Sequence, residues 1–142
     1  MAGSKVGRKV VLTRGIKPDG SPIKVMAVDD SPVTRKMLKK ALEPEGFIIV
    51  AEAGNGRDAV AAYAQANPDV ITMDVTMPIM DGLEAAAAIK KLNPSQKIIM
   101  LSAMGDKDIV AEAQSLGITD FCTKPFKPDE IIGKILKVLA EG

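Results

Sequence analysis

Histidine is absent from this 142-residue chain, and its absence excludes several kinds of chemistry. Ser-His-Asp and Cys-His catalysis, histidine-ligated metal sites and phosphohistidine carriers all require an imidazole. A single cysteine, Cys122, excludes an internal disulfide and is typical of a reducing cytoplasm. The sequence also lacks a secretory signal core and any apolar run of membrane-spanning length. We therefore expect a cytoplasmic protein with no membrane partner.

Aromatic residues are scarce, at 3% with no Trp, so the core must be aliphatic. The net charge of +1 is spread unevenly, because residues 1–22 are basic and the rest of the chain is mildly acidic. A basic arm can contact nucleic acid or an acidic protein. No aromatic side chains are interleaved with these charges, which favours a solvated tail over a nucleic-acid-binding arm. We therefore predict no DNA partner.

Turn-forming residues divide the chain into two parts. Residues 1–22 contain four glycines and two prolines, which predict a flexible N-terminal basic extension. Val10-Val11-Leu12 could add a short strand there. Residues 23–142 hold enough apolar side chains for one folded domain.

From Ile23 onward, apolar strand-like runs alternate with amphipathic helices. Ser31 offers an N-cap and Pro32 suits the first helical position, in a helix that ends before Gly46. Continuous apolar strands separated by helices predict an α/β fold, with a five-stranded parallel sheet covered on both faces. The predicted strands span 24–28, 47–51, 70–73, 98–101 and 118–122. The later helices are predicted at 57–66, 83–92, 106–116 and 128–139.

Charged or hydroxyl-bearing residues stand where four of these strands end. Asp29 and Asp30 follow the first strand, and Asp74 follows the third. Ser102 follows the fourth strand and Lys124 the fifth. Because the carboxyl ends of parallel strands meet at one edge of a sheet, ligands bind in the crevice there. We therefore expect three carboxylates, a hydroxyl and an ammonium group in one crevice.

Three clustered carboxylates repel one another unless some are protonated or a cation binds. Mg²⁺ prefers oxygen ligands, and it binds through one or two carboxylates together with water and phosphate oxygens. Lys124 can pair with the carboxylates at rest and can also hold a phosphoryl oxygen. Ser102 can donate its hydroxyl hydrogen to another phosphoryl oxygen. The pattern therefore indicates a metal-assisted phosphoryl site.

Four motifs lie at or just after these strand ends. They are Val28-Asp29-Asp30-Ser31, Asp74-Val75-Thr76-Met77-Pro78-Ile79-Met80-Asp81-Gly82, Leu101-Ser102-Ala103 and Lys124-Pro125-Phe126. Together they resemble the signature of CheY-like response-regulator receiver domains, and the resemblance covers residues 23–142. It implies the flavodoxin-like strand order 2-1-3-4-5, for which CheY is itself a standard example.

The resemblance also implies roles for individual residues. Asp74 would accept the phosphoryl group, and Ser102 and Lys124 would contact it. Phe121 matches the family's switch aromatic, with Ser102 as the residue that links it to phosphorylation. The Lys124-Pro125 peptide bond is expected to be cis. The ligands implied for Mg²⁺, or for Mn²⁺ in its place, are the carboxylates of Asp29, Asp30 and Asp74 and the main-chain carbonyl of Thr76.

The implied function is that of a switch rather than an enzyme, one that promotes its own phosphorylation and dephosphorylation. The chain ends at Gly142, just past the last helix, so we expect output through a protein partner. The segment 16–23 is similar to the lead-in of some stand-alone chemotaxis receivers, which favours chemotaxis. The expected partners are a CheA-like sensor histidine kinase, a FliM-like flagellar motor switch protein or another protein target, and a phosphatase.

Other functions remain open at this point. A phosphorelay intermediate would pass its phosphate to a histidine of another protein. A haloacid-dehalogenase-like phosphatase also uses a strand-end aspartate, but it needs a second acid two residues later, where Thr76 stands. A flavodoxin-like electron carrier would need aromatic stacking on a flavin, and only Tyr63 and three Phe are available.

Overall fold

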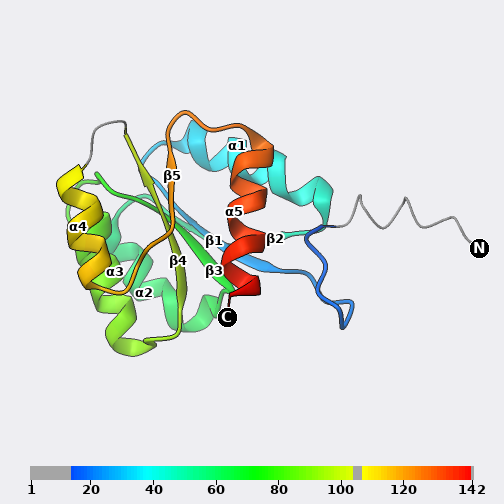
Figure 1. Cartoon of the computed structure of the whole chain (residues 1–142), viewed down its shortest axis with the longest axis horizontal. Helices are drawn as coiled ribbons and strands as arrows, with labels where there is room; N and C mark the ends of the chain where they lie inside the picture. Colours follow the sequence, from blue (N-terminus) through cyan, green and yellow to red (C-terminus); the bar gives the residue numbers. More distant parts are fainter. Residues whose placement is uncertain (1–13, 104–106, 142) are drawn as a thin grey trace, which may run out of the picture.

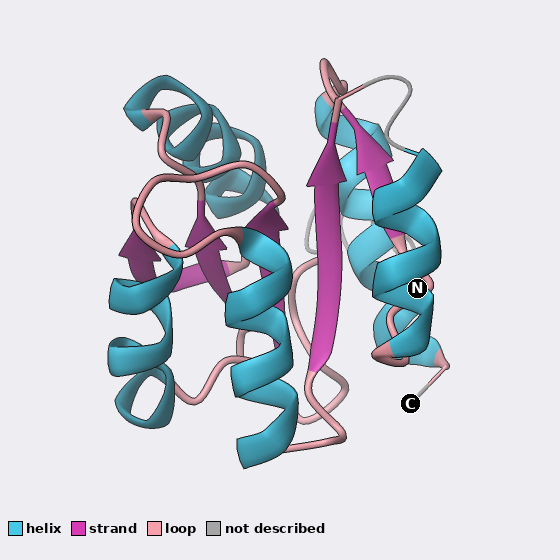
Figure 2. Cartoon of the chain, turned by 90° about the vertical axis from the view of Figure 1, so that its left-hand side faces the viewer, coloured by secondary structure: helices cyan, strands magenta, loops and turns pink. Residues whose placement is uncertain are grey.

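A parallel sheet lies between two layers of helices in the computed structural model, which describes residues 14–103 and 107–141 (Figures 1 and 2). Its five strands lie in the order β2-β1-β3-β4-β5, so the predicted fold is confirmed. The strands are β1 (Lys24–Val28), β2 (Ile48–Ala53), β3 (Val70–Asp74), β4 (Lys97–Ser102) and β5 (Phe121–Thr123). The helices are α1 (Pro32–Leu42), the 3₁₀ turn η2 (Glu43–Glu45), α2 (Gly56–Ala66), α3 (Gly82–Leu92), α4 (Lys107–Ser115) and α5 (Pro128–Ala140).

Side-chain caps fix where the first three α-helices begin. The Ser31 hydroxyl accepts a hydrogen bond from the Thr34 N–H at 3.3 Å and caps α1, as predicted. Asn55 caps α2 in the same way. Asp81 caps α3 in a capping box with Glu84. The loops after β1 and β2 are only residues 29–31 and 54–55, so the carboxyl ends of these strands lie close to helix N-termini, whereas the loop after β3 is longer and spans residues 75–81.

Two aliphatic cores cover the two faces of the sheet. One face packs against α2, α3 and α4, with side chains such as Ile71, Met73 and Ile89 fully buried. The other face packs against α1 and α5 through residues such as Leu38 and Ile135. The sheet is therefore buried on both sides, which explains why its strands are continuously apolar. Among the described helices, none combines the length and apolarity needed to cross a bilayer.

The fifth strand is shorter and begins later than the sequence predicts. The prediction was a strand over 118–122, whereas β5 begins at Phe121. Gly117 adopts a φ of 83°, a left-handed conformation that favours glycine, and it turns the chain out of α4. The next N–H, that of Ile118, donates back to the Ala113 carbonyl at 3.0 Å. Ile118 is thus apolar because it packs with α4 in the core, not because it pairs in the sheet.

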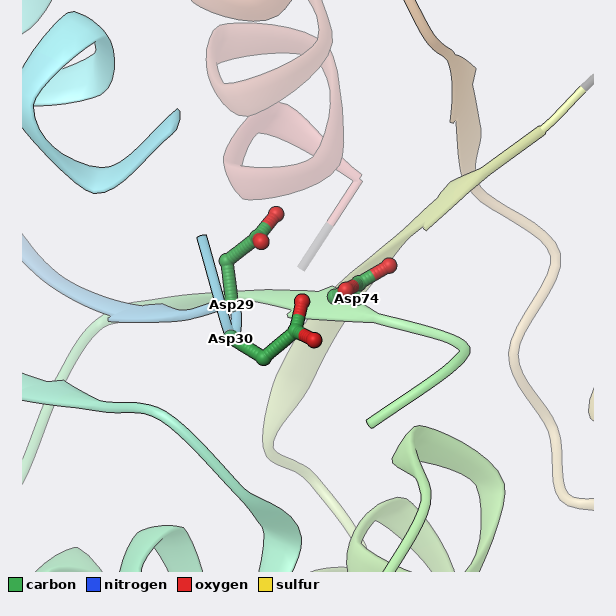
Figure 3. A group of neighbouring side chains, drawn as sticks. All are labelled: Asp29, Asp30 and Asp74. Atoms are coloured by element: carbon green, nitrogen blue, oxygen red, sulfur yellow. The ribbon is translucent and has the colours of Figure 1, made fainter. Parts of the chain in front are cut away.

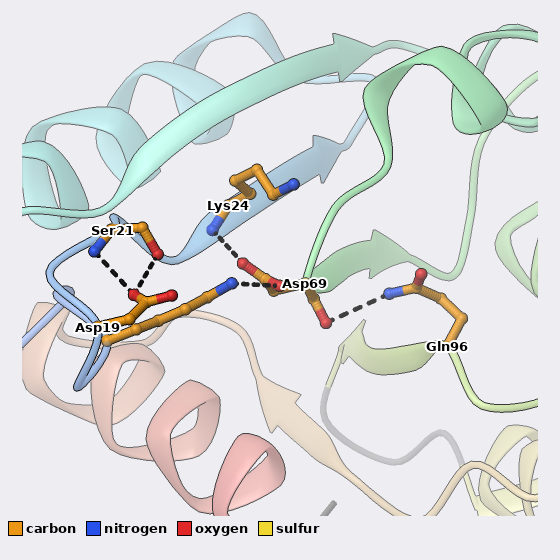
Figure 4. A network of polar contacts seen from close by, with 6 residues as sticks. Asp19, Ser21, Lys24, Asp69 and Gln96 are labelled. Carbon is orange, nitrogen blue, oxygen red and sulfur yellow. Dashed lines mark hydrogen bonds and ion pairs between the residues drawn. The ribbon is translucent and has the colours of Figure 1, made fainter.

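Residues 14–22 are the described part of the predicted extension, and they form a turn that contacts the domain (Figure 4). Lys17 Nζ lies 2.9 Å from a carboxylate oxygen of Asp69, just before β3. The other oxygen of Asp69 accepts a hydrogen bond from the Lys24 N–H at 2.8 Å. The strand considered at Val10-Val11-Leu12 lies outside the described residues. The domain boundary at residue 22 stays a prediction.

Candidate metal and phosphoryl-group site

Strand register brings the two key aspartates together. Val28 on β1 pairs with Met73 on β3, so the next residues along the two strands, Asp29 and Asp74, are neighbours at the edge of the sheet. Asp30 follows in the same loop. One carboxylate oxygen from each of the three aspartates lies within 4.8 Å of the others (Figure 3). The sequence-predicted carboxylate cluster therefore exists at the carboxyl edge of the sheet.

The hydroxyl and ammonium groups reach the same edge from the other side. Ser102, the last residue of β4, pairs with Thr123 on β5. The Lys124 N–H then donates to the Ser102 carbonyl at 2.8 Å, which fixes where the lysine leaves the sheet. The peptide bond between Lys124 and Pro125 is cis, as the resemblance implied. Ser102 therefore lies on the strand next to the one that carries Asp74, and Lys124 follows the strand after that.

Lys124 joins two of the carboxylates. Its Nζ donates to Asp29 Oδ2 at 2.7 Å and lies 3.2 Å from Asp74 Oδ1. Burial lowers the pKa of Lys124, but the hydrogen bond and the negative charges of Asp29 and Asp74 outweigh burial and raise it above its ordinary value. Lys124 is therefore an ammonium group at neutral pH.

Burial differs among the three aspartates. Asp29 is 0% exposed, and its other carboxylate oxygen accepts the Ser31 N–H at 2.9 Å. Both Asp29 oxygens thus have a partner within the protein. Asp30 is exposed, and among the described residues none donates a hydrogen bond to its carboxylate. Asp30 is consequently the carboxylate of the cluster that is most accessible from solvent.

The Asp74 carboxyl lies in surroundings that disfavour its negative charge. It is only 7% exposed, and burial raises its pKa to about 6. Asp29 and Asp30 add to this rise through their negative charges, while Lys124 opposes it. A cation beside Asp74 would therefore relieve a repulsion that the protein alone does not balance.

This imbalance predicts a pH-dependent gain in stability for Asp74→Asn when EDTA keeps the protein free of metal. The folded pKa of Asp74, about 6, lies above the ordinary 3.8, so the folded state holds the proton more tightly than the unfolded state. The stability contributed by that proton is present below pH 4 and is lost as the pH rises through 6. Asparagine removes the charge, so at pH 7.5 we expect the free energy of unfolding to rise by about 2 kcal/mol.

Urea unfolding of both proteins at pH 4.5 and 7.5 measures this gain. Glu112→Gln, which removes an exposed carboxylate from α4, is the control and should change little at either pH. An Asp74→Asn gain that is no larger at pH 7.5 than at pH 4.5 would contradict the assigned cause.

The donor set fits Mg²⁺. All three candidate side-chain ligands are carboxylates, the hard oxygen donors that this ion prefers. The exposure of Asp30 leaves room for the water molecules that Mg²⁺ usually retains. Asp30 and Asp74 would hold the ion most directly, since both Asp29 oxygens are already bonded to Ser31 and Lys124.

The remaining predicted residues lie around this cluster. Ser102 is buried, at 6% exposure, one residue beyond the β4 position that pairs with Asp74. Thr76 is exposed in the loop after β3, two residues past Asp74. Phe121 is half-buried at the start of β5 and packs against the core formed with α2, α3 and α4. Their roles toward a phosphoryl group or a metal ion stay predictions.

Sequence reasoning missed two residues that shape the site. Arg35, on α1, donates a hydrogen bond to the main-chain carbonyl of Asp29. Gly82 begins α3 so close to Asp74 that a Cβ there would lie 2.0 Å from the Asp74 carbonyl oxygen. The Asp-Gly pair at residues 81–82 signalled a turn, but nothing in the sequence showed which backbone would approach the glycine. The Arg35 contact had no sequence signal beyond its place on the first helix.

Known proteins resemble this chain over most of its length. Residues 25–136 match the family model described as "Response regulator receiver domain". The chain is 44% identical over 115 residues to the chemotaxis protein CheY of Thermotoga maritima. The matched region covers 81% of this chain and 96% of that protein. It is also 44% identical over 116 residues to the chemotaxis protein CheY of Bacillus subtilis, with 82% and 97% covered.

A solved structure shares the fold at high similarity. It is the crystal structure of the CheX-CheY-BeF3-Mg²⁺ complex from Borrelia burgdorferi, in which one chain matches with a TM-score of 0.84 and 35% identity. The match covers 89% of this chain and 96% of that chain. That complex contains Mg²⁺ and beryllofluoride.

Proposed function

This chain belongs to the response regulator receiver domain family, and from that membership we propose that it is a signalling switch phosphorylated on Asp74 in a Mg²⁺-dependent reaction. One observation carries the proposal. The nearly buried Asp74 carboxylate lies beside two further aspartates and 3.2 Å from the Lys124 ammonium. Metal and ammonium charges together would balance both the carboxylates and an incoming phosphoryl group.

The proposed reaction is a transfer between oxygen and phosphorus. A carboxylate oxygen of Asp74 attacks the phosphorus of the donor, the bond from phosphorus to the donor's leaving group breaks, and an acyl phosphate forms on Asp74. Lys124 exchanges its contact with Asp29 for a phosphoryl oxygen. The Ser102 hydroxyl donates to another phosphoryl oxygen. When bound, Mg²⁺ supplies positive charge that neutralises the transferred oxygens.

The proposed output runs from Ser102 to the surface. Phosphorylation adds negative charge and strong acceptor oxygens, and a charge-assisted hydrogen bond draws Ser102 toward them. Phe121, already half-buried, would then turn further inward beneath α4. The face formed by α4, β5 and α5 would differ between the two states, so a partner that prefers one state shifts the equilibrium.

The proposed pathway is chemotaxis. Its support is the likeness to proteins named chemotaxis protein CheY and to a structure that contains CheX together with CheY. The phosphodonor would be a CheA-like histidine kinase, and the output partner a FliM-like motor switch protein. A phosphatase would be a further partner, and a CheX-like protein would bind the chain as CheX accompanies CheY in that complex. A phosphorelay receiver is the alternative, and it would bind a histidine phosphotransfer protein but no motor component.

The proposal is tested by mixing the protein with acetyl phosphate, a small phosphodonor, and following its intact mass. With Mg²⁺ present we expect one phosphoryl group per chain, and alkali or acid should remove it because acyl phosphates hydrolyse readily. EDTA should prevent the labelling. Labelling that survives EDTA unchanged, or that resists alkali, would count against a metal-assisted aspartyl phosphate.

A further inference from the structure

Arg35 links helix α1 to the loop that carries two of the aspartates. Its Nη1 donates a hydrogen bond to the main-chain carbonyl of Asp29, and its Nε donates to Glu52 Oε1 at 3.2 Å. The side chain is only 21% exposed. A Cβ at Gly54 would lie 3.6 Å from Nη1, so the guanidinium rests against the chain just past β2. Arg35 therefore spans the gap between the β1–α1 loop and the end of β2.

The carbonyl that Arg35 holds belongs to the peptide between Asp29 and Asp30. The N–H of Asp29 is fixed separately, by donating to the Ala53 carbonyl at 3.0 Å. The two bonds together fix the backbone on both sides of Asp29. Asp30 is exposed and receives no hydrogen bond on its carboxylate from a described residue, so its position depends on this backbone. A change in the Asp29–Asp30 peptide would therefore move the Asp30 carboxylate relative to Asp74.

We propose that Arg35 is a positioning residue for the metal centre. Its guanidinium holds the Asp29–Asp30 peptide so that the Asp30 carboxylate faces Asp74. The inference rests on the proposed function, because it needs Asp30 and Asp74 to bind the ion. Groups that hold metal ligands from outside commonly change metal affinity by about 10–100-fold when removed. Arg35 would act in this way through a main-chain carbonyl rather than through a ligand side chain.

Electrostatics alone predicts the opposite effect. A guanidinium near a cation site repels the ion, so its removal should tighten metal binding by about twofold. Glu52 reduces this repulsion because its carboxylate pairs with Arg35. The same carboxylate also lies 3.8 Å from Lys39 Nζ. Lys39 thus offers a matched control. It lies on the same helix, carries the same charge and pairs with the same glutamate, and within the described residues Glu52 is its one ion-pair partner.

The test is Mn²⁺ binding, measured from the electron paramagnetic resonance signal of the free ion. Arg35→Met keeps the aliphatic stem and loses the donors, and we expect it to bind Mn²⁺ about tenfold more weakly than wild type. Arg35→Lys, which can still donate one bond to the carbonyl, should lose only about threefold. Lys39→Gln should bind as tightly as wild type or slightly more tightly. Should Arg35→Met not fold, Arg35→Gln takes its place with the same expectation.

The outcomes separate this inference from the proposed function. If wild type binds no Mn²⁺, or if Asp30→Asn binds it as wild type does, the proposed metal centre is wrong. If wild type binds and Asp30→Asn does not, while Arg35→Met binds as well as wild type or better, the metal centre stands and the positioning role of Arg35 is wrong. Weakening of Lys39→Gln to the same degree as Arg35→Met would also overturn that role, because charge alone would then explain the result.

Discussion

Replacing Asp30 by asparagine is expected to slow Mg²⁺-dependent phosphorylation of Asp74 by more than about 100-fold, while the fold stays intact. The loss should be large because a direct ligand is removed, and even groups that only hold a ligand contribute about 10–100-fold. The fold should survive because the Asp30 side chain is exposed and accepts no hydrogen bond from a described residue. The amide keeps nearly the same volume, so no packing changes.

Two measurements check this expectation. The rate of mass gain with acetyl phosphate reports the reaction. The rise in melting temperature on adding Mg²⁺, which follows from binding to the folded state, reports the metal. Both should be lost in Asp30→Asn and kept in Asp108→Asn, which changes an exposed aspartate on α4. An Asp30→Asn protein that is still stabilised by Mg²⁺ as wild type is would show that Asp30 is not a ligand.

Gly82→Ala should destabilise the protein by at least about 2 kcal/mol, because there is no space for a methyl group. A Cβ at this position would lie 2.0 Å from the Asp74 carbonyl oxygen and 3.0 Å from Val75 Cα, so backbone would have to move. The same movement would displace Asp74, and phosphorylation should slow as well. Gly82 also donates its N–H to the Val75 carbonyl at 2.8 Å, a bond that the shift would lengthen.

Gly133→Ala is the matched control for this substitution. Gly133 is exposed within α5, and a Cβ there would meet nothing within 4 Å. Alanine should therefore raise the free energy of unfolding by about 0.5–1 kcal/mol through its better helix propensity. Chemical denaturation of the two variants compares effects of opposite sign. Equal stability of Gly82→Ala and wild type would mean that the close approach of α3 to the Asp74 backbone can relax without cost.

The edge at which the site lies could be predicted from the sequence. Apolar runs ending in Asp29, Asp74, Ser102 and Lys124 give a parallel sheet whose carboxyl edge collects those side chains, and the register of β1 and β3 puts the two aspartates side by side. The start of α1 was also predictable, because the Ser31 cap and Pro32 act within one turn of chain. Interactions of this kind depend on near neighbours or on strand order alone.

Details that depend on side-chain packing could not be predicted. In the sequence the three carboxylates look equivalent. In the structure both oxygens of Asp29 accept hydrogen bonds, from Ser31 and Lys124, and Asp30 is exposed. The late start of β5 has a similar cause. An apolar Ile118 is compatible both with a strand and with packing under α4, and only the packing seen in the structure shows that it lies outside the strand. The contact of Arg35 with the Asp29 carbonyl depends on the direction of a long, flexible side chain.

The most direct test of the account is a crystal structure of the protein with beryllofluoride and Mg²⁺, the additions present in the related Borrelia burgdorferi complex. Beryllofluoride mimics the phosphoryl group, so it should be bonded to a carboxylate oxygen of Asp74. We expect Mg²⁺ against Asp30 and Asp74, and Lys124 moved from Asp29 to a fluorine. Beryllofluoride bound elsewhere, or Lys124 still paired with Asp29 and the cluster without metal, would contradict the claim that Asp74 is a metal-assisted phosphoacceptor.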